Sequence, residues 1–351
     1  MNAADLEAAR LLLTRLGITP EQLLAADPAG GRPIPTFRDY IAQVSVAVPD
    51  GTRRAYATYW RRIEDTWGDR PIDEPTPLEI KQLCEHTKGH VITRKNSRGG
   101  RSAAEHLIAA LRCLYRHATA DGLITAADNP ALRVTKPRRL PSNRRAIPNH
   151  RLAEIIRTAA TTGNDPDLDT LLLRLHTETA CRRGGALALR PRDLDPEQCL
   201  ILLHEKGGTT RWQPISPALM HGLIHHHEQR GSGANEQLLR YRNGQPITAR
   251  RYDHLWARIG RHLPWVATQQ ISTHWLRHTT LTWVERHHGY AIARAYAGHT
   301  DNSNGGTTAT YVRASLTEIA TALATLTGEP HPLAEPQTDV PPSTDTCRVG
   351  P

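Results

Sequence analysis

Residues suited to chemistry on a phosphate are concentrated between positions 274 and 311. This stretch contains the motif H-W-L-R-H, then A-G-H, and it ends with T-T-A-T-Y. A helix over the first motif would put His274 and Arg277 on one face, within reach of one ligand group. Guanidinium binds phosphate oxygens bidentately, imidazole donates or moves protons, and a phenol can attack. Together with His299 and Tyr311, the pair predicts a site that acts on a phosphodiester.

The charge of the chain favours a polyanionic partner. The 351 residues include 44 Lys and Arg against 35 Asp and Glu. Residues 1–36 carry about −1 and residues 328–351 carry −3, so the body between them carries about +13. Such a body suits nucleic acid, although a generally arginine-rich proteome would give the same excess. The length indicates two domains plus extensions.

The cysteines and histidines do not form a recognisable metal site. The five cysteines lack C-x-x-C spacing, and we find no signal peptide and no apolar run of membrane length. We therefore expect a cytoplasmic protein that is not associated with a membrane and whose cysteines are reduced. Cys84, His86 and His90 lack a fourth ligand at metal spacing, and the histidines at 225–227 would face different directions on a helix. We expect neither a metal nor a cofactor.

Apolar periodicity predicts two helical regions in the first part of the chain. Residues 1–32 are expected to form a small helical extension, and residues 33–135 a helical domain. The predicted helices lie at 4–16, 20–26, 36–46, a stretch with Thr52 as its N-cap, 76–86 with a T-P-L-E capping box, and 102–120.

Two basic segments are candidates for contact with a phosphate backbone. Residues 94–101, R-K-N-S-R-G-G-R, could follow DNA with side chains and amides, or could be a disordered loop. Residues 136–148 contain three prolines and five basic residues without an acid, which favours an exposed interdomain linker that crosses a groove. The candidate DNA-binding residues are Arg94, Lys95, Arg98, Arg101, Lys136, Arg138, Arg139, Arg144 and Arg145.

A second domain, of mixed structure, is predicted over residues 149–327. Two strands, at 200–204 and 211–215, form a β-hairpin with Lys206 at its tip. The helices are expected at 149–161, 167–178, 217–229, 248–263, from 273 onward, and at 315–326.

The last of these helices and the tail raise a question of assembly. Leu316, Ile319, Leu323 and Leu326 form an apolar stripe on a helix too short to be stable alone. The stripe could pack on its own domain or on a neighbouring protomer, and we expect the second arrangement. Residues 328–351 include six prolines and are expected to be disordered.

With these pieces in order, residues 36–327 resemble the tyrosine recombinases, also called phage-type integrases. The resemblance implies a mainly α fold of the DNA breaking-rejoining type: a helical core-binding domain, then an α+β catalytic domain of helices with a small antiparallel sheet. The family pattern T-G-x-R…L-x-L-x-x-x-D-(I/L)-D is matched by Thr179, Arg182, Leu187, Leu189, Asp193 and Asp195. The six catalytic positions are matched, in order, by Arg182, Lys206, His274, Arg277, His299 and Tyr311.

The resemblance also implies a mechanism and partners. Tyr311 would attack the phosphorus, giving a 3′-phosphotyrosine and a free 5′-hydroxyl without ATP. Arg182 and Arg277 would neutralise charge on the non-bridging oxygens, a task that many nucleases give to metal ions. Lys206 would protonate the leaving oxygen, and the two histidines would position the phosphate and handle the proton of the phenol. The expected partners are double-stranded DNA with inverted-repeat half-sites and, in the synaptic complex, a homo-tetramer formed from free monomers.

Three features depart from the family pattern. Ala180 replaces a glycine, Gly185 replaces the acid that normally supports the first arginine, and the loop before Tyr311 is longer than usual. Gly185 favours an alternative function, a catalytically impaired relative that only binds its DNA site. Relaxation of supercoils, as in the type IB topoisomerases, is a further alternative. Tyr290 and Tyr296 are rival nucleophiles, but both fall in a helix-like stretch.

The linker hypothesis makes a prediction about salt. Neutralising Arg138, Arg139, Arg144 and Arg145 should weaken binding to DNA of any sequence. It should also flatten the slope of log K against log salt by roughly 0.9 for each lost phosphate contact. Titrations at several salt concentrations measure this slope. A slope that does not change would mean that the linker is exposed without touching DNA.

Overall fold

The computed structural model describes residues 3–17, 19, 33–90, 100–138, 144–205, 208–299 and 314–334. The chain divides into two compact units, Met1–Pro141 and Ser142–Pro351. The division falls inside the basic segment 136–148. The helix expected at 20–26 and most of the basic loop at 94–101 lie outside the described residues.

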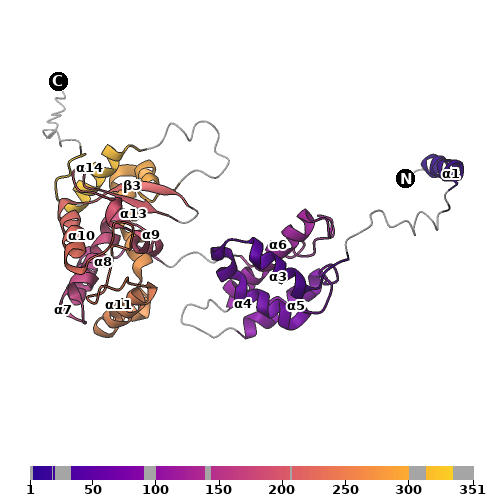
Figure 1. The fold of residues 1–351 in the computed structure, drawn as a ribbon, viewed down its shortest axis with the longest axis horizontal. Helices are drawn as coiled ribbons and strands as arrows, with labels where there is room; N and C mark the ends of the chain where they lie inside the picture. Colours follow the sequence, from indigo (N-terminus) through magenta and orange to yellow (C-terminus); the bar gives the residue numbers. More distant parts are fainter. Residues whose placement is uncertain are drawn as a thin grey trace, which may run out of the picture. The chain divides into compact units, whose positions relative to one another are not determined.

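The first unit is a cluster of helices (Figure 1), and their buried side chains form one apolar core. The helices are α3 (Phe37–Ala47), α4 (Asp50–Trp67), α5 (Pro77–Gly89) and α6 (Arg101–Ala120). The predicted stripe of α6 is buried, including Leu107, Leu111 and Tyr115, and this helix contacts the other three. Helix α1 (Ala3–Leu16) precedes the cluster, and Leu6 and Leu12 on it are exposed.

Local capping explains where two of these helices begin. The T-P-L-E capping box is present, because the Thr76 hydroxyl accepts from the Glu79 N–H and the Glu79 carboxylate accepts from the Thr76 N–H. The prediction that Thr52 caps α4 is wrong. The helix begins at Asp50 after Pro49, whose ring sets a compatible φ, and the Asp50 carboxylate in the first turn suits the helix dipole.

The second unit surrounds a small antiparallel sheet with helices. Its strands are β1 (Leu194–Asp195), β2 (Leu200–His204) and β3 (Thr210–Pro214), hydrogen-bonded in that order. Its helices are α7 (Asn149–Thr161), α8 (Pro166–Thr179), α9 (Arg183–Ala188), α10 (Pro217–Arg230), α11 (Ala249–His262), α12 (Pro264–Gln269), α13 (Thr273–Tyr296) and α14 (Leu316–Thr327). The predicted fold class, mainly helical with a small antiparallel sheet, is confirmed. The short elements β1, α9 and α12 were not predicted.

Helix α8 is at the centre of the second unit. Leu168, Leu172 and Leu175 on α8 are fully buried, and the helix contacts α7, α10, α13 and α14. The Thr280 hydroxyl of α13 donates to the carbonyl of Thr177 at 2.6 Å, which adds a polar tie between the two helices. The functional segments described below follow α8, α13 or the sheet in the chain. The packing between α8 and α13 therefore sets the relative positions of these segments.

In the single chain, helix α14 packs in cis, the alternative that the sequence left open; docking on a neighbouring protomer stays a prediction. Helix α14 packs on α13, α8 and β3 of its own unit. Ile319 and Leu323 of the predicted stripe are buried there, next to Val284 and Tyr296. Leu316, at the start of the helix, remains 37% exposed. The apolar stripe is therefore covered in cis, because α13 presents an apolar face at the right place.

The prediction of a disordered tail from residue 328 is wrong for its first seven residues. The Glu329 carboxylate pairs with Arg174 of α8 at 2.5 Å and accepts from the Ala218 N–H at 3.2 Å. His331 is buried, and its Nε2 lies 3.2 Å from the carbonyl oxygen of Cys199. Residues 328–334 thus belong to the folded unit. Among the described helices, none is long and apolar enough to cross a membrane.

The cis packing of α14 can be tested by stability. Replacing the fully buried Leu323 by alanine should lower the free energy of unfolding by about 2–5 kcal/mol, because the side chain leaves a cavity against α13. The control, Leu316→Ala on the exposed end of the same helix, should cost less than about 1 kcal/mol. Urea unfolding of the monomeric protein measures both. Equal, small costs would show that α14 does not pack on its own domain in solution.

Candidate active site

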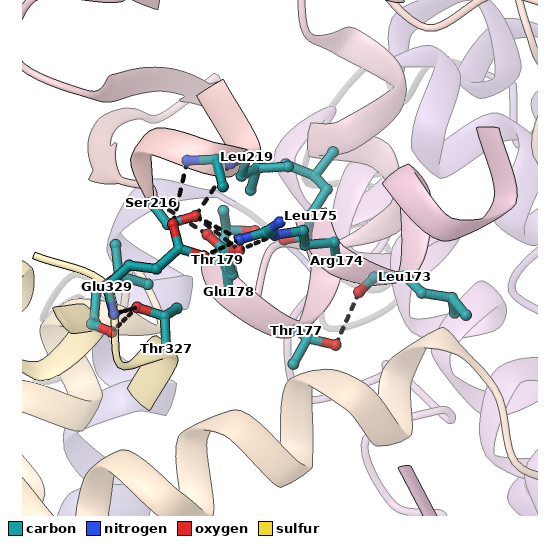
Figure 2. Close-up of polar contacts among 12 residues, drawn as sticks. Leu173, Arg174, Leu175, Thr177, Glu178, Thr179, Ser216, Leu219, Thr327 and Glu329 are labelled. Atoms are coloured by element: carbon teal, nitrogen blue, oxygen red, sulfur yellow. Dashed lines mark hydrogen bonds and ion pairs between the residues drawn. The ribbon is translucent and has the colours of Figure 1, made fainter. Parts of the chain in front are cut away.

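The end of α8 is held by hydrogen bonds and ion pairs around Glu178 (Figure 2). The Glu178 carboxylate accepts from the Ser216 N–H at 2.9 Å and pairs with the Arg174 guanidinium at 2.6 Å. Arg174 also contacts Glu329, so the segment after α14 is tied to the same place. These contacts fix the last turn of α8 immediately before the chain reaches Arg182.

A left-handed residue then turns the chain away from α8. Ala180 has φ 50° and ψ 21°, and a non-glycine residue in this region costs about 1–2 kcal/mol, which is why glycine is favoured at such helix ends. Its methyl group is fully buried beside Val284 and Tyr296, which offsets part of that cost. Two residues later Arg182 occupies the N-cap position of the short helix α9, and its side chain makes no capping hydrogen bond.

Arg277 connects three segments of the site. It lies on α13 and is only 4% exposed. Its Nη1 donates to the carbonyl of Ala180, and its Nη2 donates to the carbonyl of Ala297 at 2.7 Å. Burial, followed by repulsion from Arg182, lowers the pKa of this guanidinium to about 10. Arg277 therefore remains charged at neutral pH while tying the turn before Arg182 to the A-G-H segment.

The two candidate histidines lie at the edge of this cationic cluster. His274 and His299 are both exposed. Partial burial lowers the pKa of each ring, and Arg277 and Arg182 lower both further by repulsion; Arg144 also acts on His274. Because both pKa values lie below the ordinary value, both imidazoles are neutral at pH 7 and able to accept a proton.

Glu205 is a residue of this site that sequence reasoning missed. Its carboxylate, at the end of β2, accepts from Arg182 Nη1 at 2.7 Å, and its side chain is only 3% exposed. No sequence signal identified it, because an acid in a glycine-containing turn is usually solvated. Arg182 is therefore oriented by an acid from the hairpin and not by position 185, which holds a buried glycine.

Arg211 is the second residue that was missed. It lies on β3, its side chain is 14% exposed, and its Nη2 is 3.7 Å from Glu205 Oε1. Burial lowers its pKa. A Cβ at Gly298 would lie 2.5 Å from Arg211 Nε, so the glycine of the A-G-H motif leaves room for this guanidinium. Arg211 thus adds a third cation beside Arg182 and Arg277.

The tyrosines differ in their access to the site. Tyr296 is fully buried and its hydroxyl donates to the carbonyl of Glu178, and burial raises the pKa of the phenol. Tyr296 is therefore unsuited to attack a phosphate. Tyr290 is 63% exposed on α13 and stacks beneath the Arg294 guanidinium at 5.6 Å. Tyr311 and Lys206, the predicted nucleophile and general acid, lie outside the described residues.

The candidate DNA-binding residues are only partly described. Arg94, Lys95, Arg98 and Arg139 lie outside the described residues. The structure places Arg101, Lys136 and Arg138 on the surface of the first unit and Arg144 and Arg145 on the surface of the second. Arg144 is near enough to His274 to lower the pKa of that ring. Within the described part of the chain, no three His, Cys, Asp or Glu side chains are grouped as metal ligands.

The arrangement of helices and sheet is the fold of DNA integrases. A lambda integrase tetramer bound to a Holliday junction superposes with a TM-score of 0.59 at 15% identity, covering 87% of this chain and 89% of that one. The Tn1549 transposon integrase in complex with circular intermediate DNA gives a TM-score of 0.57 at 16% identity, covering 80% and 95%. At such identities the likeness establishes the fold.

The sequence comparison identifies the family. Residues 145–318 match the phage integrase family. The tyrosine recombinase XerC of Xanthomonas axonopodis pv. citri (strain 306) is 27% identical over 252 residues, which cover 70% of this chain and 79% of that protein. The chain belongs to the tyrosine recombinase, or phage integrase, family, and the resemblance inferred from its motifs is confirmed.

A buried histidine next to the site predicts a dependence of stability on pH. His176 Nδ1–H donates to the Cys181 carbonyl at 3.1 Å, which leaves Nε2 to accept from the Tyr252 hydroxyl at 3.0 Å. Burial lowers the pKa of His176 to about 4. Above an unfolded pKa of about 6.5 the ring is neutral in both states and its contribution is complete. As the pH falls from about 6.5 to about 4, only the unfolded state binds the proton, and stability is lost.

The expected loss from His176 over this window is up to about 3 kcal/mol. Urea unfolding at a series of pH values should therefore show a shallower decline for His176→Gln than for the wild type. The control, His254→Gln on the exposed face of α11, should keep the wild-type slope. If His176→Gln keeps the wild-type slope, the loss of stability at low pH comes from other groups. His226 is one such group, because burial also lowers its pKa to about 4.

Proposed function

We propose that this chain is a site-specific recombinase that cuts and rejoins double-stranded DNA through a covalent 3′-phosphotyrosine at Tyr311. One observation carries the proposal: Arg277 donates to the carbonyls of Ala180 and Ala297, which brings the motif segments that hold Arg182 and His299 together although they are far apart in the sequence. A cluster of fixed cations beside neutral imidazoles is suited to a phosphodiester. Membership of the tyrosine recombinase family supports the same reaction.

In this proposal each residue has one task. The Tyr311 oxygen attacks the phosphorus, and the bond from phosphorus to the 5′-oxygen breaks as the new bond forms. Arg182 and Arg277 stabilise the charge that grows on the non-bridging oxygens. Lys206 gives a proton to the leaving 5′-oxygen, and a neutral histidine takes the proton of the phenol. The covalent bond conserves the energy of the broken one, so rejoining needs neither ATP nor a metal ion.

The proposed partners follow from the reaction and from related proteins. Rejoining between two duplexes needs several active sites at once, and the lambda integrase structure is a tetramer bound to a Holliday junction. We infer that this chain acts as a homo-tetramer on DNA with inverted-repeat half-sites and is a monomer when free. The exposed basic residues near the interdomain segment, such as Arg138 and Arg144, are the proposed phosphate contacts.

A binder without catalytic activity is the alternative, and Gly185 is the observation that favours it. An unsupported Arg182 would be poorly placed to stabilise a transition state. The contact between Arg182 and Glu205 weakens the case for an inactive binder, because the carboxylate of Glu205 orients the guanidinium in place of an acid at position 185. The two functions differ in a product that can be measured, the covalent adduct.

The nucleophile can be tested with a suicide substrate, a nicked half-site from which the cleaved fragment diffuses away. The wild-type protein should form an SDS-resistant adduct, whereas Tyr311→Phe should bind with nearly unchanged affinity and form none, because the attacking oxygen is missing. Tyr290→Phe, which removes an exposed hydroxyl on α13, is the matched control and should keep the adduct. Binding without any wild-type adduct would establish the inactive binder, and an adduct with Tyr311→Phe would place the nucleophile elsewhere.

A further inference from the structure

The Glu205 carboxylate lies between the guanidiniums of Arg182 and Arg211, two of the cations in the candidate site. Its Oε2 accepts from Arg182 Nη1 at 2.7 Å, and its Oε1 lies 3.7 Å from Arg211 Nη2. The carboxylate is almost completely buried, whereas 39% of the Arg182 side chain is exposed. A buried carboxylate without a cation would be costly, so the pairing with arginine is strongly favoured. Among the described residues, Glu205 is the one acid within ion-pair distance of Arg182.

The backbone around Glu205 is also fixed. Its N–H donates to the carbonyl of Thr209 at 2.7 Å, which closes the base of the turn between β2 and β3. The preceding residue, His204, is still part of β2 and its Nε2 lies 3.1 Å from the buried carboxylate of Asp193. Glu205 therefore extends from a rigid strand end, and the next residue in the chain is Lys206.

Position 185 faces the same strand end. Gly185 is buried on α9, and a Cβ built there would lie 3.5 Å from the carbonyl oxygen of His204, an ordinary contact distance. The space between α9 and the end of β2 is thus shared by positions 185 and 205. In this chain the side chain that reaches Arg182 from this space is that of Glu205, directly after the strand.

We propose that Glu205 is a positioning residue for cleavage, which acts by holding Arg182 against the scissile phosphate. The inference deepens the proposed function and rests on it. Arg182 has several rotatable bonds, and its cationic neighbours Arg211 and Arg277 repel it. A fixed carboxylate on the protein side leaves the outer N–H groups of the guanidinium for the phosphate. Without this anchor, Arg182 would have to be ordered in each catalytic cycle.

The test is a double-mutant cycle on covalent-adduct formation, with full-length protein at saturating suicide substrate. Glu205→Gln keeps the shape of the side chain and removes its charge. It should lower the rate constant by about ten- to a hundredfold, since misplacing a transition-state contact is nearly as costly as losing it. In an Arg182→Ala background the same substitution should change the much slower rate by less than about twofold, because its effect passes through Arg182.

The matched control is Asp253→Asn. Asp253 pairs with the neighbouring Arg183 at 3.5 Å, both side chains are exposed, and removing this carboxylate should leave the rate unchanged. DNA affinity and the thermal unfolding midpoint are measured for every variant. If Glu205→Gln does not fold, Glu205→Asp, which draws the carboxylate back by one methylene, replaces it in the same cycle.

The outcomes separate this inference from the proposed function. Loss of rate that disappears in the Arg182→Ala background supports the positioning role. An equal loss in both backgrounds means that Glu205 acts only on the structure, and a rate within twofold of the wild type means that Arg182 needs no anchor; either result overturns the inference. Both leave the proposed function intact, because the wild-type adduct alone decides it.

Discussion

The geometry of the site depends on one buried guanidinium. Arg277 donates to the carbonyl of Ala180 at the end of α8 and to that of Ala297 after α13. The first of these carbonyls lies two residues before Arg182, and the second lies two residues before His299. A single side chain thus joins three segments that are far apart in the sequence. A neutral residue at position 277 would remove a charge and also leave two buried carbonyls without donors, which is costly in a packed interior.

Three arginine side chains lie close together in the site and repel one another, and the surrounding fold holds them in place. Burial lowers the pKa of Arg277 most, Arg182 and Arg211 lower it further, and Glu205 raises it. The helices around the cluster are fixed by contacts that lie away from it, such as the Glu178 network (Figure 2) and the buried side chains of α14. The cations are therefore held in place before any DNA arrives. A phosphate that binds there would reduce their repulsion, so preorganisation serves both binding and catalysis.

Departures from the family pattern have physical explanations in the structure. Position 180 needs a left-handed backbone, and alanine is tolerated there because its methyl group is buried in an apolar cluster. Position 185 lacks an acid, but Glu205 reaches the same arginine from the facing strand end. A sequence motif specifies a residue type at one position in the chain. The site needs only that the side chain lies at the right place in space, so a residue from a neighbouring element can supply it.

The sequence alone determined the elements whose signals are local. The capping box at Thr76, the hairpin strands and the amphipathic face of α6 follow from short-range periodicity and hydrogen bonding. The order of the motifs likewise determined the family. Only the tertiary structure decided that α14 packs in cis, that Glu205 orients Arg182 and that Tyr296 is buried. These features depend on contacts between residues that are far apart in the sequence. The residues next to each position do not indicate which distant residue it will contact.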